Sequence, residues 1–341
     1  MAQINKPTDY FNTVLYTSTS ANQSVTGVGF EPDWCWIKDR TSANSHHLFD
    51  QVRGAGERLM SDQTTAESTV TSFSSFDADG FTLGSQGQGI TTNNNNYASW
   101  NWLANGVGVS NTDGSITSTV SASTVSGFSI VSYTGTGANA TVGHSLGSVA
   151  KMIMVKRRDT TGRWQVYHNG LGATKYLFLD GDEAEQTNSN RWNDTNPTSS
   201  VFNLGSSAEV NASGGTYIAY CFAEKKGFSK FGSYTGNGST DGTFVYTGFK
   251  PAWVMVKRTN STGGWLMVDN KRDPFNVVYK NVQADSSGAE YSGVDRMDFL
   301  ANGFKHRYTS TVQNGSGDSY IYMCFAENPL VSSAGVPCTA R

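Results

Sequence analysis

The chain has 341 residues, a formal net charge of −3 and only 16% charged residues. No run of Lys or Arg forms a basic stripe, which argues against nucleic-acid binding. No apolar stretch approaches the roughly 18 residues that a membrane span requires, so we expect no membrane insertion. Aromatic residues make up 12% of the chain, and Gly occurs 37 times. Many aromatics, many turn-forming residues and few charges are typical of an all-β protein.

A strand-like segment that ends in Lys is the clearest internal repeat. It occurs as FEPDWCWIKDR at 30–40, VAKMIMVKRR at 149–158 and KPAWVMVKR at 250–258. The spacing is regular, since 101 residues separate Lys156 from Lys257 and 101 separate Tyr133 from Tyr234. A segment that recurs at a fixed period indicates a building unit more than an active site.

The repeat divides the chain into units of about 90–100 residues, each long enough for one hydrophobic core. The predicted parts are a first β-sandwich repeat at 9–104, a Gly/Ser/Thr-rich linker at 105–127, a second repeat at 128–226, a third repeat at 229–328 and a C-terminal tail at 329–341. Within the linker, the alternating segment ITSTVSAS is compatible with an added strand.

The recognisable segments are short, alternate with period two, and are bounded by Gly, Asn or Asp. We therefore predict an all-β fold of three tandem antiparallel β-sandwich modules, jelly-roll-like in form. The segment YIAYCFA at 217–223 is apolar on both faces, which places it in the middle of a sandwich or between modules. No window has amphipathic helix spacing, and 50–62 is the one stretch compatible with a short helical turn.

The repeated strand predicts one apolar face and a polar end. The face carries Trp34 and Trp36 in the first unit, Met152 and Met154 in the second, and Trp253 and Met255 in the third. Large apolar side chains at all three sites indicate a core position. The lysines that follow, Lys38, Lys156 and Lys257, are expected to meet water.

The sequence contains no GxSxG, HExxH, P-loop or Gly-rich dinucleotide motif. The four cysteines lack CxxC spacing, so we expect Cys35, Cys221 and Cys324 to be buried strand thiols. The five histidines lack metal-ligand spacing and are expected in exposed loops or at strand edges. We therefore predict no catalytic residue, no metal, no cofactor, and a protein that is not an enzyme.

The acidic segment DGDEAE at 180–185 allows two interpretations. It loosely resembles a calcium loop, but it lacks the full EF-hand pattern and flanking helices, which favours a solvated hairpin tip. Glu183 and Glu185 would serve as glycosidase acids only if another carboxylate lay at the right distance across a cleft.

Two differences between the copies concern function. Trp164 and Trp265 occupy equivalent places after a turn, where a ring could stack on a sugar, but their equivalence favours a core role. His168 stands where the other units have Asp50 and Asp269. Specialisation and drift explain that substitution equally well.

Five elements of the repeat carry a resemblance: SYTGNG, GFEPDWCWIKDR, HLFDQVRG, DADGFTLG and YASWNW. They resemble a repeat of virion proteins of marine tailed bacteriophages, a family described as tail-fibre-like or of unknown function. The segment NTDGSITSTVSASTVSGFSIVSYTG and the ending ENPLVSSAGVPCTAR are also similar, so the resemblance runs from about Tyr10 to Arg341. The middle unit departs from the pattern because it lacks the proline, the VRG and the DGF.

The resemblance implies a structural protein of the virion. The first residues, MAQINKPTDYFNT, lack the apolar region of a classical signal peptide. This agrees with synthesis in the host cytoplasm and release by lysis. Expected partners are other virion proteins and further copies of the chain, with a homotrimer favoured, because apolar strand faces beyond one core are commonly buried between subunits.

Three functions follow as hypotheses. The favoured one is a tail fibre or host-adhesion component that binds a surface polysaccharide through loops such as 91–97 and 188–200. Its candidate binding residues are Trp192, Asn95 and Asn96. The alternative is a capsid decoration or tail-assembly protein without a ligand. A polysaccharide depolymerase is less favoured, since no triad or clear carboxylate cleft is visible.

Overall fold

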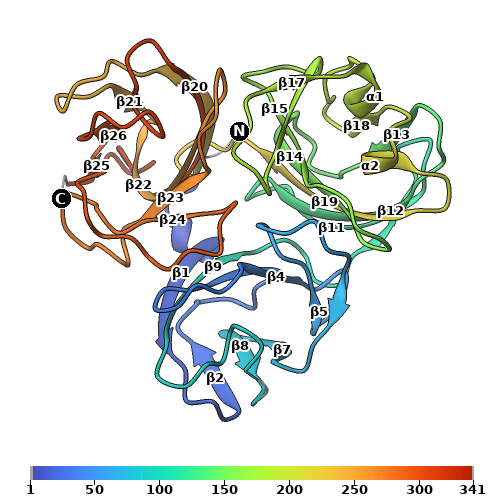
Figure 1. Cartoon of the computed structure of the whole chain (residues 1–341), viewed down its shortest axis with the longest axis horizontal. Coiled ribbons are helices and arrows are strands. Elements are labelled where there is room, and N and C mark those ends of the chain that lie inside the picture. Colours follow the sequence, from blue (N-terminus) through green and yellow to red (C-terminus); the bar gives the residue numbers. More distant parts are fainter. Residues whose placement is uncertain (1–2, 86, 340–341) are drawn as a thin grey trace.

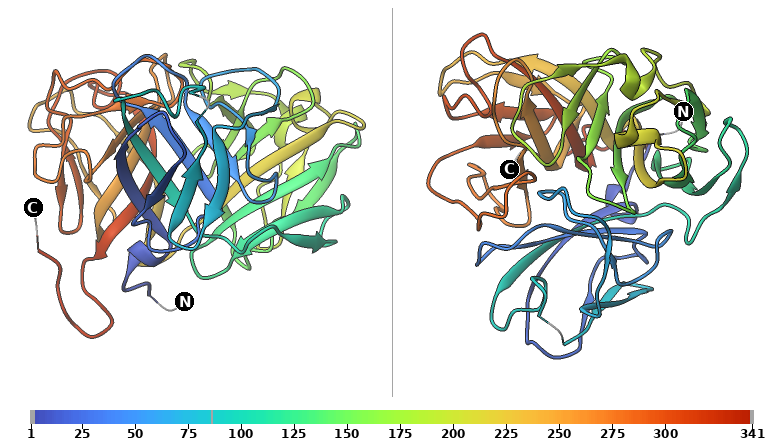
Figure 2. Two further views of the ribbon diagram at one scale, coloured as in Figure 1. Left: turned by 90° about the horizontal axis from the view of Figure 1, so that it is seen from below. Right: turned by 45° about the vertical axis from the view of Figure 1, so that its right-hand side comes forward.

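The computed structural model describes residues 3–85 and 87–339, which form three units around a common centre (Figure 1). Each unit has an inner sheet that faces the centre and a smaller outer sheet at the periphery (Figure 1). The inner-sheet strands pair antiparallel and cross the thickness of the molecule when it is viewed edge-on (Figure 2). The predicted all-β fold of antiparallel sandwiches is confirmed.

The first unit follows the 3-10 helix η1 (Pro7–Asp9). Its inner sheet has the order β1 (Phe11–Thr17), β9 (Asn96–Trp102), β3 (Trp34–Asp39) and β4 (His47–Asp50). Its outer sheet has the order β2 (Gln23–Thr26), β8 (Gly80–Leu83) and β7 (Phe73–Asp77). A separate pair joins β5 (Glu57–Arg58) to β6 (Ser68–Thr69). The stretch 50–62 therefore contains β5 and turns in place of a helical turn.

The second unit has the largest inner sheet. Its order is β10 (Val109–Asn111), β11 (Ser118–Ser123), β12 (Phe128–Thr134), β19 (Thr216–Ala223), β14 (Ala150–Arg157), β15 (Gln165–His168), β16 (Lys175–Phe178) and β17 (Gln186–Thr187). The outer sheet pairs β13 (Ala140–Gly143) with β18 (Val201–Leu204). Two single-turn helices, α1 (Ser189–Trp192) and α2 (Ala208–Asn211), flank β18. The segment 105–127 thus holds two strands that extend the second unit's sheet, including the strand over ITSTVSAS.

The third unit repeats the plan of the first. Its inner sheet has the order β20 (Ser229–Thr235), β27 (Ser319–Pro329), β22 (Phe249–Arg258), β23 (Leu266–Asp269) and β24 (Val282–Gln283). Its outer sheet has the order β21 (Phe244–Tyr246), β26 (Gly303–His306) and β25 (Met297–Leu300). None of the helices in the part of the chain described here is long and apolar enough to cross a membrane.

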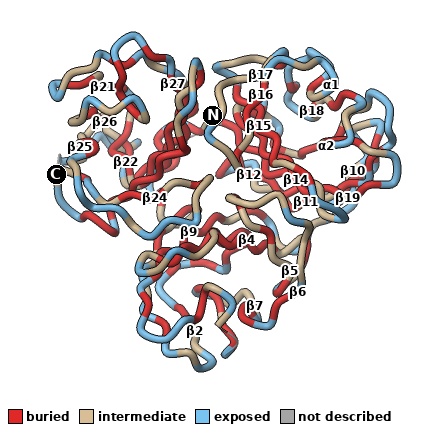
Figure 3. Tube along the Cα trace, viewed as in Figure 1, coloured by how far each residue is buried: buried red, intermediate tan, exposed pale blue. Residues whose placement is uncertain are grey.

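Both faces of each inner sheet are buried, and the two faces belong to different cores (Figure 3). In β3, Cys35 and Ile37 pack toward the first unit's outer sheet, whereas Trp34 and Trp36 pack into a core shared by all three units. The period-two alternation of a strand produces this division. The same division occurs in β19 of the second unit, which explains why YIAYCFA is apolar on both faces.

Three aromatic rings meet where the units converge. They are Trp102, Phe222 and Phe325, which occupy equivalent places in β9, β19 and β27. Their ring centroids lie 6.5, 5.6 and 6.1 Å apart, with edge-to-face angles between 62° and 70°. Edge-to-face packing of this kind is favoured for aromatic groups. The centre of the molecule is therefore a closed hydrophobic core with one ring from each unit.

Each strand-end lysine closes a junction to the neighbouring unit. The Nζ atoms donate to main-chain carbonyls across the junctions: Lys38 to Ser287 at 3.1 Å, Lys156 to Thr64 at 2.9 Å and Lys257 to Glu183 at 2.8 Å. All three lysines are buried, so the prediction that they meet water is wrong. Burial lowers the pKa of each to about 8, because desolvation penalises the ammonium. The contacts run in one sense around the ring and link every unit to the next.

Indole groups make a second set of junction contacts. Trp164 Nε1 donates to Met60 O, and Trp265 Nε1 donates to Phe178 O, both at 2.8 Å. The core role favoured for these two tryptophans is what the structure shows. In the first unit His46 takes this place, with its Nε2 atom 3.0 Å from Gln283 O.

Candidate binding site between the first and third units

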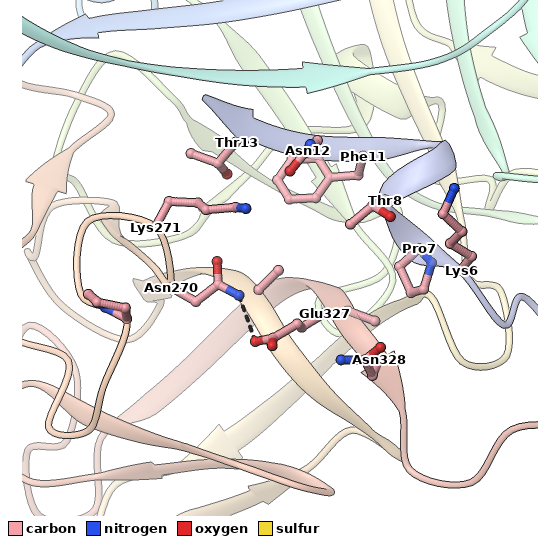
Figure 4. Close-up of a pocket in the computed structure, with 13 residues that line it drawn as sticks. Lys6, Pro7, Thr8, Phe11, Asn12, Thr13, Asn270, Lys271, Glu327 and Asn328 are labelled. Atoms are coloured by element: carbon pink, nitrogen blue, oxygen red, sulfur yellow. Dashed lines mark hydrogen bonds between the residues drawn. The ribbon is translucent and has the colours of Figure 1, made fainter. Parts of the chain in front are cut away.

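A cavity of about 380 Å³ lies where the start of the first unit meets the third unit (Figure 4). The first unit supplies η1 and the beginning of β1. Pro7 starts η1, and the backbone N–H of Tyr10 donates to Pro7 O, which turns the chain into β1. Phe11 then anchors the strand, since its ring stacks on Phe325 of the third unit at 4.9 Å. This anchor places Asn12 and Thr13 at the pocket wall.

The third unit supplies the opposite wall through the ends of β22, β23 and β27. Asn270 directly follows β23, where its backbone N–H donates to Ala252 O. Its Nδ2 atom donates to Glu327 Oε2 at 2.7 Å (Figure 4). Lys250 Nζ lies 3.5 Å from the other oxygen of Glu327. The Glu327 carboxylate is therefore fixed in direction by two neighbours.

Two polar atoms at this pocket have no hydrogen-bond partner among the described residues. They are Asn270 Oδ1 and Thr13 Oγ1, and both side chains are more than nine-tenths buried. An unsatisfied buried polar atom costs about 1–3 kcal/mol, so each calls for a bound water or ligand group. Figure 4 shows the exposed Lys271 side chain extending into the space between them. The pocket thus gathers an amide, a hydroxyl, an ammonium and a carboxylate.

This set of groups suits recognition of a ligand rich in hydroxyls. Amides, hydroxyls and a carboxylate together donate and accept hydrogen bonds, as sugar hydroxyls do. Glu327 is the single acidic residue among those that line the pocket. Hydrolysis by paired carboxylates requires two. The arrangement therefore supports binding.

The matching place at the junction of the first and second units has a different composition. Strand register aligns Thr13 with Ile130, which is a core residue. There Asp33 accepts hydrogen bonds from the backbone N–H groups of Ala104 and Gly106. Burial raises the pKa of Asp33 to about 6. The first–second junction therefore has a core isoleucine where the third–first junction has Thr13.

The three predicted binding residues do not lie at this pocket. Trp192 is only 2% exposed, because the single turn of α1 directs its ring against Tyr167 in the second unit's core. A ring buried there offers no face to a sugar, so the prediction that Trp192 binds a glycan is wrong. Asn95 is 8% exposed, and its Nδ2 donates to Asp39 Oδ2 at 2.7 Å. That bond makes it a structural residue of the loop before β9.

Asn96 is the one exposed member of the three. Its Oδ1 atom accepts a hydrogen bond from Thr17 on the neighbouring strand at 2.8 Å. It lies in the first unit, whereas Trp192 belongs to the second, so the predicted residues do not form one site. The sequence showed polar loops but not which of them meet.

The histidines differ from expectation, whereas the acidic segment lies in the loop of the β16–β17 hairpin, the favoured interpretation. All five histidines are buried, so the prediction of exposed loop or edge positions is wrong. In the acidic segment, Asp180 and Glu183 pair with Arg163, and Glu185 pairs with Lys175. Residues 3–85 and 87–339 hold no group of three His, Cys, Asp or Glu side chains arranged for a metal ion. The main chain of the acidic segment also meets the third unit, because Lys257 Nζ donates to Asp182 O and Glu183 O, and the Glu185 N–H donates to Thr259 O.

Sequence reasoning missed Thr13, Asn270, Lys271 and Glu327. A weak signal existed in the third copy of the repeat, where the HLFDQVRG element reads LMVDNKRD and presents an Asn–Lys pair after the strand. Nothing in the sequence connects this pair to Thr13, because the two come together only where the third unit packs against the first.

A family model described as a domain of unknown function (DUF7483) matches residues 6–329, nearly the whole chain. No curated protein and no solved structure matches it.

Proposed function

The chain belongs to this DUF7483 family of unknown function, and we propose that it is a structural protein of a tailed-bacteriophage virion that binds a host-surface glycan. The virion setting is supported by the resemblance of the repeat to phage virion proteins. The observation that carries the binding role is the pocket between the first and third units, with its two unsatisfied polar atoms. A sugar ring with several hydroxyls is the ligand that such a mixed set of donors and acceptors recognises.

The alternative is a decoration or assembly protein without a ligand, and the closed ring of units supports it. Such a protein needs rigid modules and no accessible site. The central core and the buried junction lysines supply that rigidity within one chain. We favour adhesion because a purely structural module has no use for the two unsatisfied polar atoms at this pocket. A second polar pocket, of about 560 Å³, lies between the second and third units.

The test combines position and binding. Cryo-EM of the purified virion would locate the chain, and a glycan array would be probed with the isolated protein and with Lys271→Ala and Asn270→Ala variants. We expect density at the tail periphery. On the array, we expect the unaltered protein to bind a glycan, and each variant to bind that glycan at least tenfold more weakly. Lys305→Ala, which removes a lysine of the third unit's outer sheet that lines neither junction pocket, is the control. Density confined to the capsid lattice without glycan retention would favour decoration, and absence from the virion would overturn the proposal.

A further inference from the structure

The third unit differs from the other two in its surface. The strongly exposed aromatic residues of the described chain all lie in this unit: Phe244, Tyr246, Phe275, Tyr279 and Tyr291. Three of them lie between β23 and β25, in a stretch that has only β24 as regular structure. Exposed aromatics gathered in one loop region indicate an interaction site more strongly than scattered ones. The charged groups beneath this region therefore bear on what it binds.

Arg296 is buried directly beneath these loops. It directly precedes β25 and is 9% exposed. Its guanidinium carbon lies 5.6 Å from the ring of Tyr291 and 5.8 Å from the ring of Tyr308. Its Nη atoms donate only to the neutral side chains of Gln313 and Asn281, both at 3.3 Å. Its Nε atom has no partner among the described residues.

No carboxylate of the described residues lies within ion-pair distance of Arg296, and three of the four nearest in sequence are engaged elsewhere. Glu290 pairs with Arg40 and Arg272, across the junction to the first unit. Asp298 pairs with Arg307. The Asp285 carboxylate accepts the backbone N–H of Trp265. Asp295 is exposed and has no ion pair among the described residues.

The other fully buried arginines show how unusual this is. Arg53 and Arg272 each contact two carboxylates. A buried charge without a partner is strongly unfavourable. Strand register aligns Arg296 with Ser72 of the first unit, so the fold does not require an arginine there. An unneutralised guanidinium at a position that the fold leaves free points to a counter-ion from outside the chain.

A hollow of about 310 Å³ opens beside Arg296, and residues of the segment 281–291, including Tyr291, form the rest of its lining. Arg296 is the single charged residue that lines it. Tyr291 forms a partly exposed aromatic wall, with 51% of its surface accessible. The volume suits a single sugar ring, the guanidinium suits a carboxylate, and the tyrosine suits the apolar face of a sugar.

We propose that Arg296 and Tyr291 form a binding site for a carboxylate-bearing sugar of the hexuronate class. The proposal of an anion site is supported by the unpaired guanidinium and the hollow. The proposal that the anion belongs to a sugar rests on the proposed glycan-binding function. The site is separate from the pocket at the junction of the first and third units. The carboxylate is expected to bind the guanidinium, and the ring is expected to lie against Tyr291.

Isothermal titration of the full chain with glucuronate, glucose, acetate and sulfate tests this site. We expect glucuronate to bind at least tenfold more tightly than glucose or acetate. Arg296→Gln should abolish this preference, and Tyr291→Ala, a change at an exposed ring, should weaken glucuronate by about threefold or more. Arg58→Gln, at a half-buried arginine without an ion pair among the described residues, should leave glucuronate binding unchanged.

The outcomes separate the two proposals. Equal binding of glucuronate and glucose to the wild-type chain, or an unaltered affinity in a folded Arg296→Gln or Tyr291→Ala variant, would overturn the hexuronate site. Acetate or sulfate binding as tight as glucuronate would overturn the sugar as carrier. Lys271→Ala, a change at the junction pocket, should not alter glucuronate binding at Arg296. Failure of glycan binding at the junction pocket would therefore leave the test of the Arg296 site unaffected.

Discussion

The two junctions made by the first unit differ from the junction between the second and third units at one buried position and at the two residues that contact it. This position is the last residue of β4, β15 and β23. At the first–second junction it is Asp50, which binds Arg53 and accepts a hydrogen bond from Tyr220 of the second unit at 2.7 Å. At the third–first junction it is Asp269, which binds Arg272 and accepts from Trp100 of the first unit at 3.1 Å.

At the second–third junction the same position is His168. Gly170 N–H donates to its Nδ1 atom, so the proton resides on Nε2, which donates to Tyr322 O of the third unit at 3.1 Å. The residue three positions later is Leu171 in place of an arginine, and Met323 stands where the other junctions have a donor. Acid, arginine and donor are thus all replaced at the same junction.

The difference teaches that a buried carboxylate persists in this fold only together with its partners. An aspartate at 168 would face Met323 and Leu171 and would be desolvated without compensation. A neutral histidine can satisfy one carbonyl without an ion pair. The replacement of the acid and the arginine in the second unit is therefore consistent with electrostatics at the junction, and it does not need a specialised role for His168.

The largest expected effect on stability comes from removing one arginine from a buried ion pair, Asp50–Arg53 at the first–second junction or Asp269–Arg272 at the third–first junction. Arg53→Met leaves Asp50 and Glu67 without their buried partner, so unfolding free energy should fall by about 3–5 kcal/mol. Arg272→Met should cost a similar amount. The measurement is urea unfolding followed by tryptophan fluorescence.

The matched control for these variants is Arg157→Met. Its ion pair with Asp159 lies at the surface of the second unit, so about 0–1 kcal/mol should be lost. If Arg53→Met cost no more than this control, the buried ion pairs would not hold the junctions together.

The second prediction concerns acid stability at the histidine junction. Burial lowers the pKa of His168 to about 4, from 6.5 in the unfolded chain. The unfolded state therefore binds more protons between these values, so the stabilising contribution is complete above pH 6.5 and is lost as pH falls toward 4. His168→Gln should cost little at pH 7 and should reduce the loss of stability at pH 4 by about 3 kcal/mol.

Unfolding curves of both proteins at pH 7 and pH 4 provide the measurement. The other buried histidines remain in the variant and act as an internal reference. An identical pH dependence for the two proteins would show that His168 does not titrate in this window.

How far the sequence predicts this molecule depends on whether a feature is local. The alternation in YIAYCFA and the Trp34–Trp36 face predicted strands with two buried sides, and the structure assigns each side to its own core. The sequence suggested a homotrimer to cover such faces. In the structure the three units of one chain cover these faces for each other. Burial of the faces therefore does not depend on a homotrimer, and the oligomeric state stays a prediction.

Features that depend on distant contacts were not predictable. The polar surroundings of Trp192 suggested an exposed loop, but one helical turn directs the ring inward. Lys38 resembles a solvated strand end, yet its ammonium is held by the carbonyl of Ser287, 249 residues away. The pocket joins Thr13 to Asn270 through closure of the ring. Local patterns encode each strand, whereas the site arises from the order in which the units meet.

The smallest expected effect tests whether the acid that follows each junction loop matters equally. Glu67, Glu185 and Glu290 are equivalent, because each donates its backbone N–H across a junction, to Arg158, Thr259 and Arg40 respectively. Glu290 also contacts two arginines, so Glu290→Gln should cost about 1–3 kcal/mol. Glu185 pairs only with the partly exposed Lys175 of its own unit, so Glu185→Gln should cost about 0–1 kcal/mol. Urea midpoints of the two variants measure the difference. Equal losses would mean that the side-chain charges of these acids do not distinguish the junctions.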